Sequence, residues 1–174
     1  MLLLKHMPHA GRNQFQTEEK HADVLSDIQK VMDYMKKELK IEKFHFPIHG
    51  DDRGKLIAIE EYKDIPFPVK RVYYIFDTLP GVRRGFHAHL HLQQALICVH
   101  GSCKIHLDNG YEQAEVLLDQ PDEGLYISND MWREMYDFSE DAVLMVLASD
   151  YYDESDYIRN SEKFIEMVHS KEEN

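Results

Sequence analysis

The stretch Gly85-Phe86-His87-Ala88-His89-Leu90-His91-Leu92 carries the strongest structural signal in this 174-residue sequence. Its histidines alternate strictly with apolar residues, and successive side chains of a β-strand point to opposite faces. The alternation therefore predicts a strand with three imidazoles on one face and an apolar opposite face. Two or three histidines on one side of a strand form a cluster of groups that titrate near neutral pH. A solvent-exposed polar face would give the same alternation, so periodicity alone leaves both interpretations open.

The sequence on either side of this stretch consists of short apolar runs separated by turn residues. Such runs with regular turns are typical of an antiparallel sandwich or barrel, and the double-sheet jelly roll is the usual container of this size. An all-β jelly-roll barrel is therefore the predicted fold. The expected strands are Lys55–Tyr62, Arg71–Asp77, Gly85–Leu92, Ala95–His100, Ser102–Leu107, Gln113–Leu118, Gly124–Ile127, Met131–Tyr136 and Ala142–Ala148.

Both ends of the chain carry helical patterns. Between Thr17 and Lys40 apolar residues recur at three- and four-residue steps without proline or glycine, which predicts an amphipathic helix. Residues 156–172 have apolar positions on one side and predict a C-terminal helix. Residues 1–16 show no pattern and are expected to be a disordered lead. The predicted organisation is a lead (1–16), a helical extension (17–42) and one β domain with a C-terminal helix (43–174).

The charge balance limits the class of partner. The chain has 32 acidic and 20 basic residues, and its net charge of −12 argues against a nucleic acid or an anionic membrane. A small-molecule partner fits better. No apolar run reaches the length of a signal-peptide core or a membrane span, so we expect a cytoplasmic protein. Cys98 and Cys103 form no CxxC motif and are expected to be buried thiols.

The spacing of glycines and histidines around the predicted strand resembles the first motif of the cupin superfamily. Its positions are occupied here by Gly81, His87, His89, Gln94 and Gly101. Metal-binding cupins have a glutamate in place of Gln94, and they supply a further histidine from a second motif whose best counterpart here ends in Arg133. A divalent metal prefers imidazoles and carboxylates, and a guanidinium would repel it. We therefore expect a cupin-type barrel with no metal and no cofactor.

Basic, aromatic and polar residues supply the remaining candidates for the site. Without a metal, His87 and His89 can serve as general base and general acid. An anionic ligand would require a local concentration of positive charge in this acidic protein, and a tyrosine could hold an oxyanion or a sugar hydroxyl. Glu134 could orient a histidine or pair with an arginine. The predicted substrate-binding residues are Arg53, Arg71, Tyr73, Arg84, Gln94, Arg133 and Glu134.

Several further segments extend the cupin pattern, namely 53–54, 57–61, 70–77, 84–89, 101–103, 124–126, 132–135 and 148–159. Together they resemble the bacterial dTDP-4-keto-6-deoxyglucose 3,4-ketoisomerases. The resemblance implies a metal-free jelly roll that forms a homodimer. It also implies an isomerase that moves the keto group of dTDP-4-keto-6-deoxy-D-glucose from C4 to C3, on the way to deoxyamino sugars of surface polysaccharides.

The implied reaction suits the two histidines. The C4 carbonyl acidifies the proton on C3, so a base of near-neutral pKa can remove it, and the enediolate is then reprotonated at C4. His87 and His89 are expected to share these roles, in an order that spacing leaves open. The C4 configuration of the product also stays open, because Arg53 and Arg133 occupy positions that differ between family members giving the axial and the equatorial hydroxyl, and this chain combines the two types. The alternatives are a 3,5-epimerase acting on the same nucleotide sugar, a metal-dependent cupin oxygenase, and a non-catalytic sugar-binding module.

Overall fold

The computed structural model describes residues 24–28, 30–31 and 38–171, and the chain divides into the compact units Met1–Glu38 and Leu39–Asn174. In the first unit, residues 24–28 and 30–31 are helical. The predicted disordered lead lies outside the described residues, as does most of the helix predicted for 17–40. The predicted C-terminal end of that helix at Lys40 is wrong, because residues 38–41 are not helical and a strand begins at Glu42.

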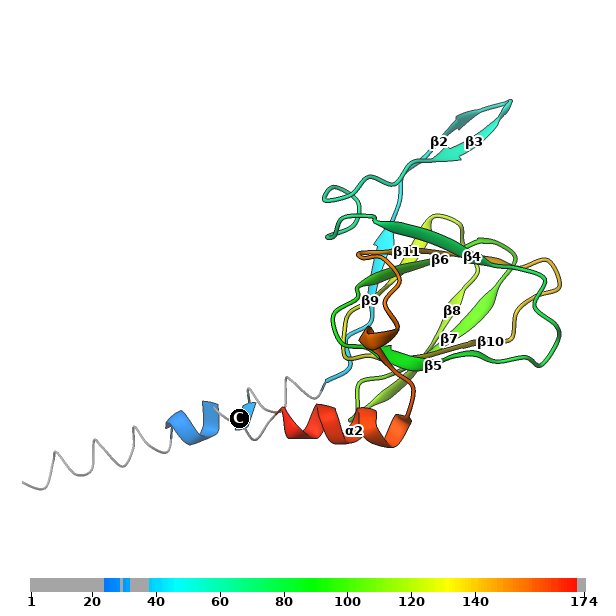
Figure 1. The fold of residues 1–174 in the computed structure, drawn as a ribbon. Helices are drawn as coiled ribbons and strands as arrows, with labels where there is room; N and C mark the ends of the chain where they lie inside the picture. The colour runs from blue at the N-terminus through cyan, green and yellow to red at the C-terminus, as the bar shows by residue number, and fades with distance from the viewer. Residues whose placement is uncertain (1–23, 29, 32–37, 172–174) are drawn as a thin grey trace, which may run out of the picture. The chain divides into compact units, whose positions relative to one another are not determined.

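The second unit is built from two five-stranded antiparallel sheets that face each other (Figure 1). The first sheet has the order β1 (Glu42–His45), β9 (Glu123–Ile127), β6 (Gln94–His100), β11 (Val143–Ala148), β4 (Arg71–Ile75). The second has the order β12 (Tyr157–Ile158), β5 (Arg84–His89), β10 (Trp132–Tyr136), β7 (Cys103–Asp108), β8 (Gln113–Leu118). Neighbours in these orders come from distant parts of the sequence. This arrangement confirms the predicted jelly roll.

A hairpin of β2 (Ile48–Asp51) and β3 (Gly54–Ile57) forms a separate two-stranded sheet (Figure 1). The sequence predicted one strand at Lys55–Tyr62, but the observed strand ends at Ile57. Neither β1 nor β2 was predicted. Both are mostly exposed, and their charged residues and histidines do not produce the alternation that marks a half-buried strand. Their strand conformation is set by pairing with β9 and β3.

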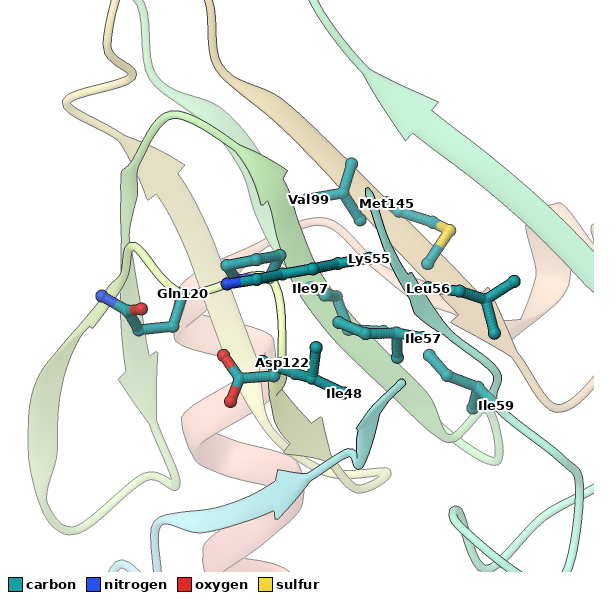
Figure 2. Close-up of a pocket in the computed structure, with 11 residues that line it drawn as sticks. Ile48, Lys55, Leu56, Ile57, Ile59, Ile97, Val99, Gln120, Asp122 and Met145 are labelled. Atoms are coloured by element: carbon teal, nitrogen blue, oxygen red, sulfur yellow. The ribbon is translucent and has the colours of Figure 1, made fainter. Parts of the chain in front are cut away.

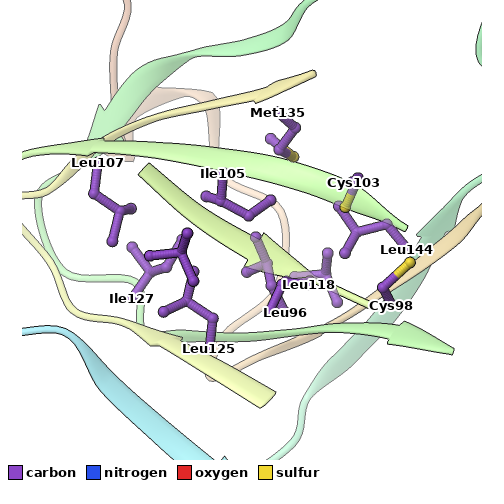
Figure 3. Packing of buried hydrophobic residues seen from close by; sticks show 12 residues of the cluster. Leu96, Cys98, Cys103, Ile105, Leu107, Leu118, Leu125, Ile127, Met135 and Leu144 are labelled. Atoms are coloured by element: carbon purple, nitrogen blue, oxygen red, sulfur yellow. The ribbon is translucent and has the colours of Figure 1, made fainter. Parts of the chain in front are cut away.

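The main apolar core fills the space between the two sheets (Figure 3). Strand β7 shows why, because Cys103, Ile105 and Leu107 are buried while the residues between them are half-buried. Leu96 and Cys98 on β6 and Leu144 on β11 meet them from the opposite sheet. Both cysteines are buried and free, as predicted.

A C-terminal helix, α2 (Ser161–Ser170), covers the outer face of the second sheet (Figure 1). It begins after Asn160, whose side chain accepts a hydrogen bond from the backbone N–H of Lys163, as an N-cap residue does. Phe164 of α2 packs with Ala88 of β5 and Trp132 of β10. The apolar face of the histidine strand is therefore buried under a helix, which leaves its histidine face to point between the sheets.

The predicted C-terminal helix is confirmed, but its start at residue 156 is wrong. A 3₁₀ turn, η1 (Glu154–Asp156), and the short strand β12 precede α2. Asp153 caps the 3₁₀ turn by accepting a hydrogen bond from the backbone N–H of Ser155. Tyr157 and Ile158 then pair with β5. Pairing with β5 therefore holds Tyr157 and Ile158 in an extended conformation, although the spacing of apolar residues alone predicted a helix.

Truncating Phe164 to alanine should destabilise the protein by about 3–5 kcal/mol, because it removes the buried ring that joins α2 to β5. Urea unfolding of Phe164→Ala measures this. The matched control is Glu166→Ala, an exposed position of the same helix, which should change the free energy of unfolding by less than about 0.5 kcal/mol. Equal stability of the two variants would show that α2 does not support the barrel.

Candidate active site

The histidines of β5 are aimed by a β-bulge at the start of that strand. Arg133 of β10 pairs with His87, but Glu134 pairs with Gly85, so Phe86 is an extra residue on β5. Gly85 has φ 94° and Phe86 has φ 54°, which is the left-handed region. A Cβ at position 85 would lie 2.7 Å from the backbone oxygen of Arg133, so only glycine fits there. The bulge leaves Phe86 exposed and lets His87 and His89 point inward.

His87 and His89 lie side by side in a buried position between the sheets. Their relative exposures are 8% and 1%, and their ring centroids are 4.8 Å apart in an edge-to-face arrangement. The ring of Tyr157 contacts both, at 4.9 Å from His87 and 4.2 Å from His89. The third histidine of the motif, His91, lies beyond the end of β5 and is exposed. The pair is therefore a compact buried unit and not a solvated polar face.

Arg133 is the charged centre of this site. It lies on β10 opposite His87, and its side chain is 1% exposed. Among the residues that the structure describes, its Nε and Nη1 have no hydrogen-bond partner, and its Nη2 makes only a 3.5 Å contact with the backbone oxygen of Ser128. A buried guanidinium with unused donors is suited to an anionic ligand.

Burial and the Arg133 cation determine the charge of the two imidazoles. Burial, with a smaller contribution from Arg133, lowers the pKa of His87 to about 4. The same two causes hold the pKa of His89 well below its usual value. Both imidazoles are therefore neutral at pH 7, which is the state in which each can accept a proton. A divalent cation would meet the same positive potential, so the donor set does not suit a metal.

The first sheet contributes Tyr73, Gln94 and Arg71. Gln94 is buried at the start of β6, and its amide nitrogen donates a hydrogen bond to the Tyr73 hydroxyl at 2.9 Å. Burial raises the pKa of Tyr73, which keeps the phenol protonated and able to donate. The Arg71 guanidinium stacks on the rings of Tyr73 and Tyr152, at 5.5 and 5.7 Å. These residues extend the site from the histidines toward the exposed Tyr152.

The segment before α2 contributes two residues that the sequence interpretation missed, Asp156 and Tyr157. Asp156 Oδ2 lies 2.9 Å from His89 Nδ1, and Tyr157 contacts both histidine rings. Both residues had been placed in the C-terminal helix. The signal that could have found them is the aromatic and β-branched pair Tyr157-Ile158 directly after the turn at Asp153.

Three predicted substrate-binding residues are not brought to the histidines within this chain. Arg53 lies in the exposed turn of the β2–β3 hairpin, where it pairs with Asp51. Arg84 is exposed at the first residue of β5. Glu134 lies on the opposite face of β10 from Arg133, because adjacent strand residues alternate, and it accepts hydrogen bonds from Arg83 and Trp132. Of the two roles expected for Glu134, pairing with an arginine is observed, and among the described residues no hydrogen bond joins Glu134 to a histidine.

An apolar groove on the outer face of the first sheet is separate from this site (Figure 2). It is lined by side chains of the β2–β3 hairpin, including Leu56 and Ile57, and of β6 and β11, including Ile97 and Met145. None of its lining residues is a histidine or an arginine. The groove has the character of a contact surface, with Lys55 and Asp122 as its charged lining residues.

Comparison with known proteins agrees with this geometry. Residues 37–169 match the family model described as FdtA: WxcM-like, C-terminal. The chain belongs to this family. A TDP-4-oxo-6-deoxy-α-D-glucose-3,4-oxoisomerase of Aneurinibacillus thermoaerophilus is 56% identical to this chain over 126 residues. The match covers 71% of this chain and 91% of the relative. The resemblance inferred from sequence motifs is therefore confirmed.

Solved structures extend the comparison. A 3,4-ketoisomerase of Helicobacter canadensis is 47% identical, with a TM-score of 0.73 over 76% of this chain and 99% of that one. A second solved structure is the sugar 3,4-ketoisomerase QdtA of Thermoanaerobacterium thermosaccharolyticum in complex with TDP, which is 46% identical to this chain. Its TM-score is 0.74, and the match covers 75% of this chain and 96% of the QdtA chain. In the part of this chain that is described, no helix is long and apolar enough to cross a membrane.

The neutral buried histidines predict a pH dependence of stability. An unfolded histidine has a pKa of about 6.5, whereas that of folded His87 is about 4. Between these values the unfolded state binds a proton that the folded state does not, so stability should fall as the pH decreases through this window. Urea unfolding at pH 7 and pH 5 should show a smaller loss for His87→Asn than for the wild type. The exposed control His91→Asn should keep the wild-type loss, and equal losses in all three proteins would contradict the assignment.

Proposed function

We propose that this chain catalyses the 3,4-ketoisomerisation of TDP-4-keto-6-deoxy-D-glucose. The observation that carries the proposal is the pair of buried, neutral imidazoles next to the buried cation of Arg133. Neutral imidazoles can accept and return protons, and a fixed cation can stabilise the negative charge that develops on a sugar oxygen. The names and ligands of the relatives, a TDP-sugar oxoisomerase and a ketoisomerase with bound TDP, support the same substrate class.

The reaction is a redistribution of protons within the sugar. A base removes the proton from C3, whose C–H bond is acidified by the C4 carbonyl, and the bonding electrons form an enediolate with its charge on the C4 oxygen. A proton is then delivered to C4, and the hydrogen on the C3 oxygen is transferred to the C4 oxygen. The product has a C3 carbonyl and a C4 hydroxyl, and no oxidant or reductant is consumed. His87 and His89 carry the protons in this proposal, while Arg133 and the Tyr73 hydroxyl stabilise the enediolate oxygen.

The rim of the site is suited to the TDP part of the substrate. Arg71 has a buried Nε without a hydrogen-bond partner in the described part of the chain, and its guanidinium lies near the rings of Tyr73 and Tyr152. Lys70 lies over the exposed ring of Tyr151. Positive charge next to exposed aromatic rings suits a diphosphate joined to a base, because the cations pair with the phosphates and the rings offer a stacking surface.

A 3,5-epimerase acting on the same sugar nucleotide is the second candidate. It is favoured by one observation, the pairing of His89 with the carboxylate of Asp156 next to a tyrosine. The two reactions differ in the carbon that exchanges hydrogen with solvent. An NMR time course with TDP-4-keto-6-deoxyglucose in deuterated buffer should show deuterium at C4 of a 3-keto product and none at C5. Deuterium at C5 with the keto group still at C4 would establish the epimerase instead.

Replacing either histidine should remove most turnover while leaving the fold intact. His87→Asn and His89→Asn should each lower kcat by about 10²–10⁴-fold, the usual contribution of a positioned acid or base. Product formation by NMR measures the loss, and circular dichroism checks the fold. His91→Asn is the control, because its side chain is exposed outside the strand. Near-normal activity in both active-site variants would refute the proposed proton transfer.

We also propose that the chain forms a homodimer through the outer face of the first sheet. Val72 and Tyr74 are exposed on that face of the edge strand β4, and Phe76 continues the row with its ring 5.8 Å from that of Tyr74. A second groove, which Val72 also lines, contains Ile59, Met145 and other apolar side chains together with one carboxylate, Glu61. Adjoining exposed apolar patches of this kind mark protein contact surfaces.

A charge placed in this surface should separate the two chains. Light scattering after size exclusion should give the mass of two chains for the wild type and of one chain for Tyr74→Glu, because an unpaired carboxylate is costly in a buried interface. The control is Leu117→Glu, which changes an exposed apolar side chain on β8 of the other sheet and should leave the dimer intact. A wild-type mass of one chain, or an unaffected Tyr74→Glu dimer, would refute this interface.

A further inference from the structure

We infer that Asp156 is a positioning residue that selects the tautomer of His89 and leaves the imidazole Nε2 as its proton-accepting atom. The inference deepens the proposed function and rests on it for its catalytic meaning. Its structural content is independent of any substrate, because it concerns which nitrogen of one buried ring carries the proton. The observations that support it are the hydrogen bonds of one carboxylate and the burial of one nitrogen.

The carboxylate of Asp156 is fully engaged by the end of β5. Its Oδ2 lies 2.9 Å from His89 Nδ1, and its Oδ1 accepts a hydrogen bond from the backbone N–H of His91 at 2.9 Å. The backbone oxygen of Asp156 also accepts a hydrogen bond from the N–H of Leu90 at 3.0 Å. Three successive residues of β5 and its exit are thus tied to a single residue, which holds the carboxylate in place relative to the imidazole.

This arrangement determines the tautomer of His89. An ionised carboxylate only accepts hydrogen bonds, so Nδ1 must be the nitrogen that carries hydrogen. A neutral imidazole has one N–H, and Nε2 is therefore left with its lone pair. In the described part of the chain, Nε2 is buried and has no hydrogen-bond partner. An unprotonated, unpaired nitrogen inside the site is the group expected of a base.

The groups around His89 explain why a positioned carboxylate is needed. Arg133 faces it from β10, His87 from its own strand and Arg71 from β4, while Tyr157 and Arg159 approach from the segment of β12. Burial and, to a smaller extent, these arginine cations oppose a second proton on the ring, which keeps His89 neutral before the reaction. Asp156 is the carboxylate that contacts the imidazole, so it can stabilise the positive charge while the proton resides there. His87 has no such ion pair among the described residues, which distinguishes the two imidazoles.

Asp156→Asn tests the inference with almost no change in shape. The amide offers one acceptor and one donor group in place of two acceptors. The backbone N–H of His91 cannot change, whereas the imidazole can move its proton to Nε2 and accept from the amide at Nδ1. The expected result is a His89 tautomer with Nε2–H and a fall in kcat of about 10²–10⁴-fold, as for loss of the orienting carboxylate in a catalytic triad. KM should stay within about threefold, because Asp156 acts through His89.

Two measurements on the 174-residue chain decide the outcome. Long-range ¹H–¹⁵N NMR of the histidine rings in the ligand-free protein should show Nδ1–H on His89 in the wild type and Nε2–H in Asp156→Asn. Steady-state kinetics with TDP-4-keto-6-deoxyglucose should show the loss in kcat. Asp156→Glu, which keeps an acceptor-only group, should retain the wild-type tautomer and more activity than Asp156→Asn. Glu166→Gln removes an exposed carboxylate of helix α2, away from the site, and should match the wild type in both measurements.

Failure of the inference and failure of the proposed function give different results. A wild-type His89 with Nε2–H, or an Asp156→Asn protein with wild-type kcat and tautomer, would overturn the inference. If Asp156→Asn does not fold, the tautomer of the wild-type ring still decides. A wild type that shows the Nδ1–H tautomer but does not isomerise the sugar would refute the proposed function while leaving the positioning role of Asp156 in place.

Discussion

The rest of the site depends on the burial of the Arg133 guanidinium between the two sheets. A buried charge is costly when its hydrogen-bonding groups are unpaired, and in the described structure Nε and Nη1 of Arg133 have no partner. Burial lowers the pKa of Arg133 only to about 10, so the group remains a cation at neutral pH. Its field adds to the larger effect of burial, which keeps the neighbouring imidazoles neutral, and it favours negative charge on a bound sugar oxygen. The net charge of −12 therefore coexists with a locally positive site.

The short strand β12 positions residues of the C-terminal segment next to the two histidines of the site. By pairing Tyr157 and Ile158 with β5, it places the Tyr157 ring against both histidines. The preceding 3₁₀ turn ends at Asp156, whose carboxylate holds the His89 imidazole. The following helix α2 covers the outer side of β5. One continuous C-terminal segment thus supports the histidine strand on both faces, which links the stability of the barrel end to the geometry of the site.

Particular residues show how far the sequence could predict this site. Alternation placed His87 and His89 on one face, and burial of Ala88 under α2 shows that this face points inward. The same rule separates neighbours, because Arg133 points inward and Glu134 outward. If this alternation rule had also been applied to β10, it would have placed Glu134 on the face that points away from His87 and His89. Charge composition suggested Arg53 and Arg84 without any information on their faces, and within this chain both are exposed.

The sequence by itself determined the double-sheet barrel, the placement of His87 and His89 on one face of a strand, and the replacement of metal ligands by Gln94 and Arg133. These features depend on local periodicity and on the identity of single residues, which a sequence displays directly. Only the tertiary structure decided that Asp156 meets His89, 67 positions away, and that Gln94 meets Tyr73, 21 positions away. The physical reason is that strand pairing between distant segments brings such residues together. No local pattern records which strands will be neighbours.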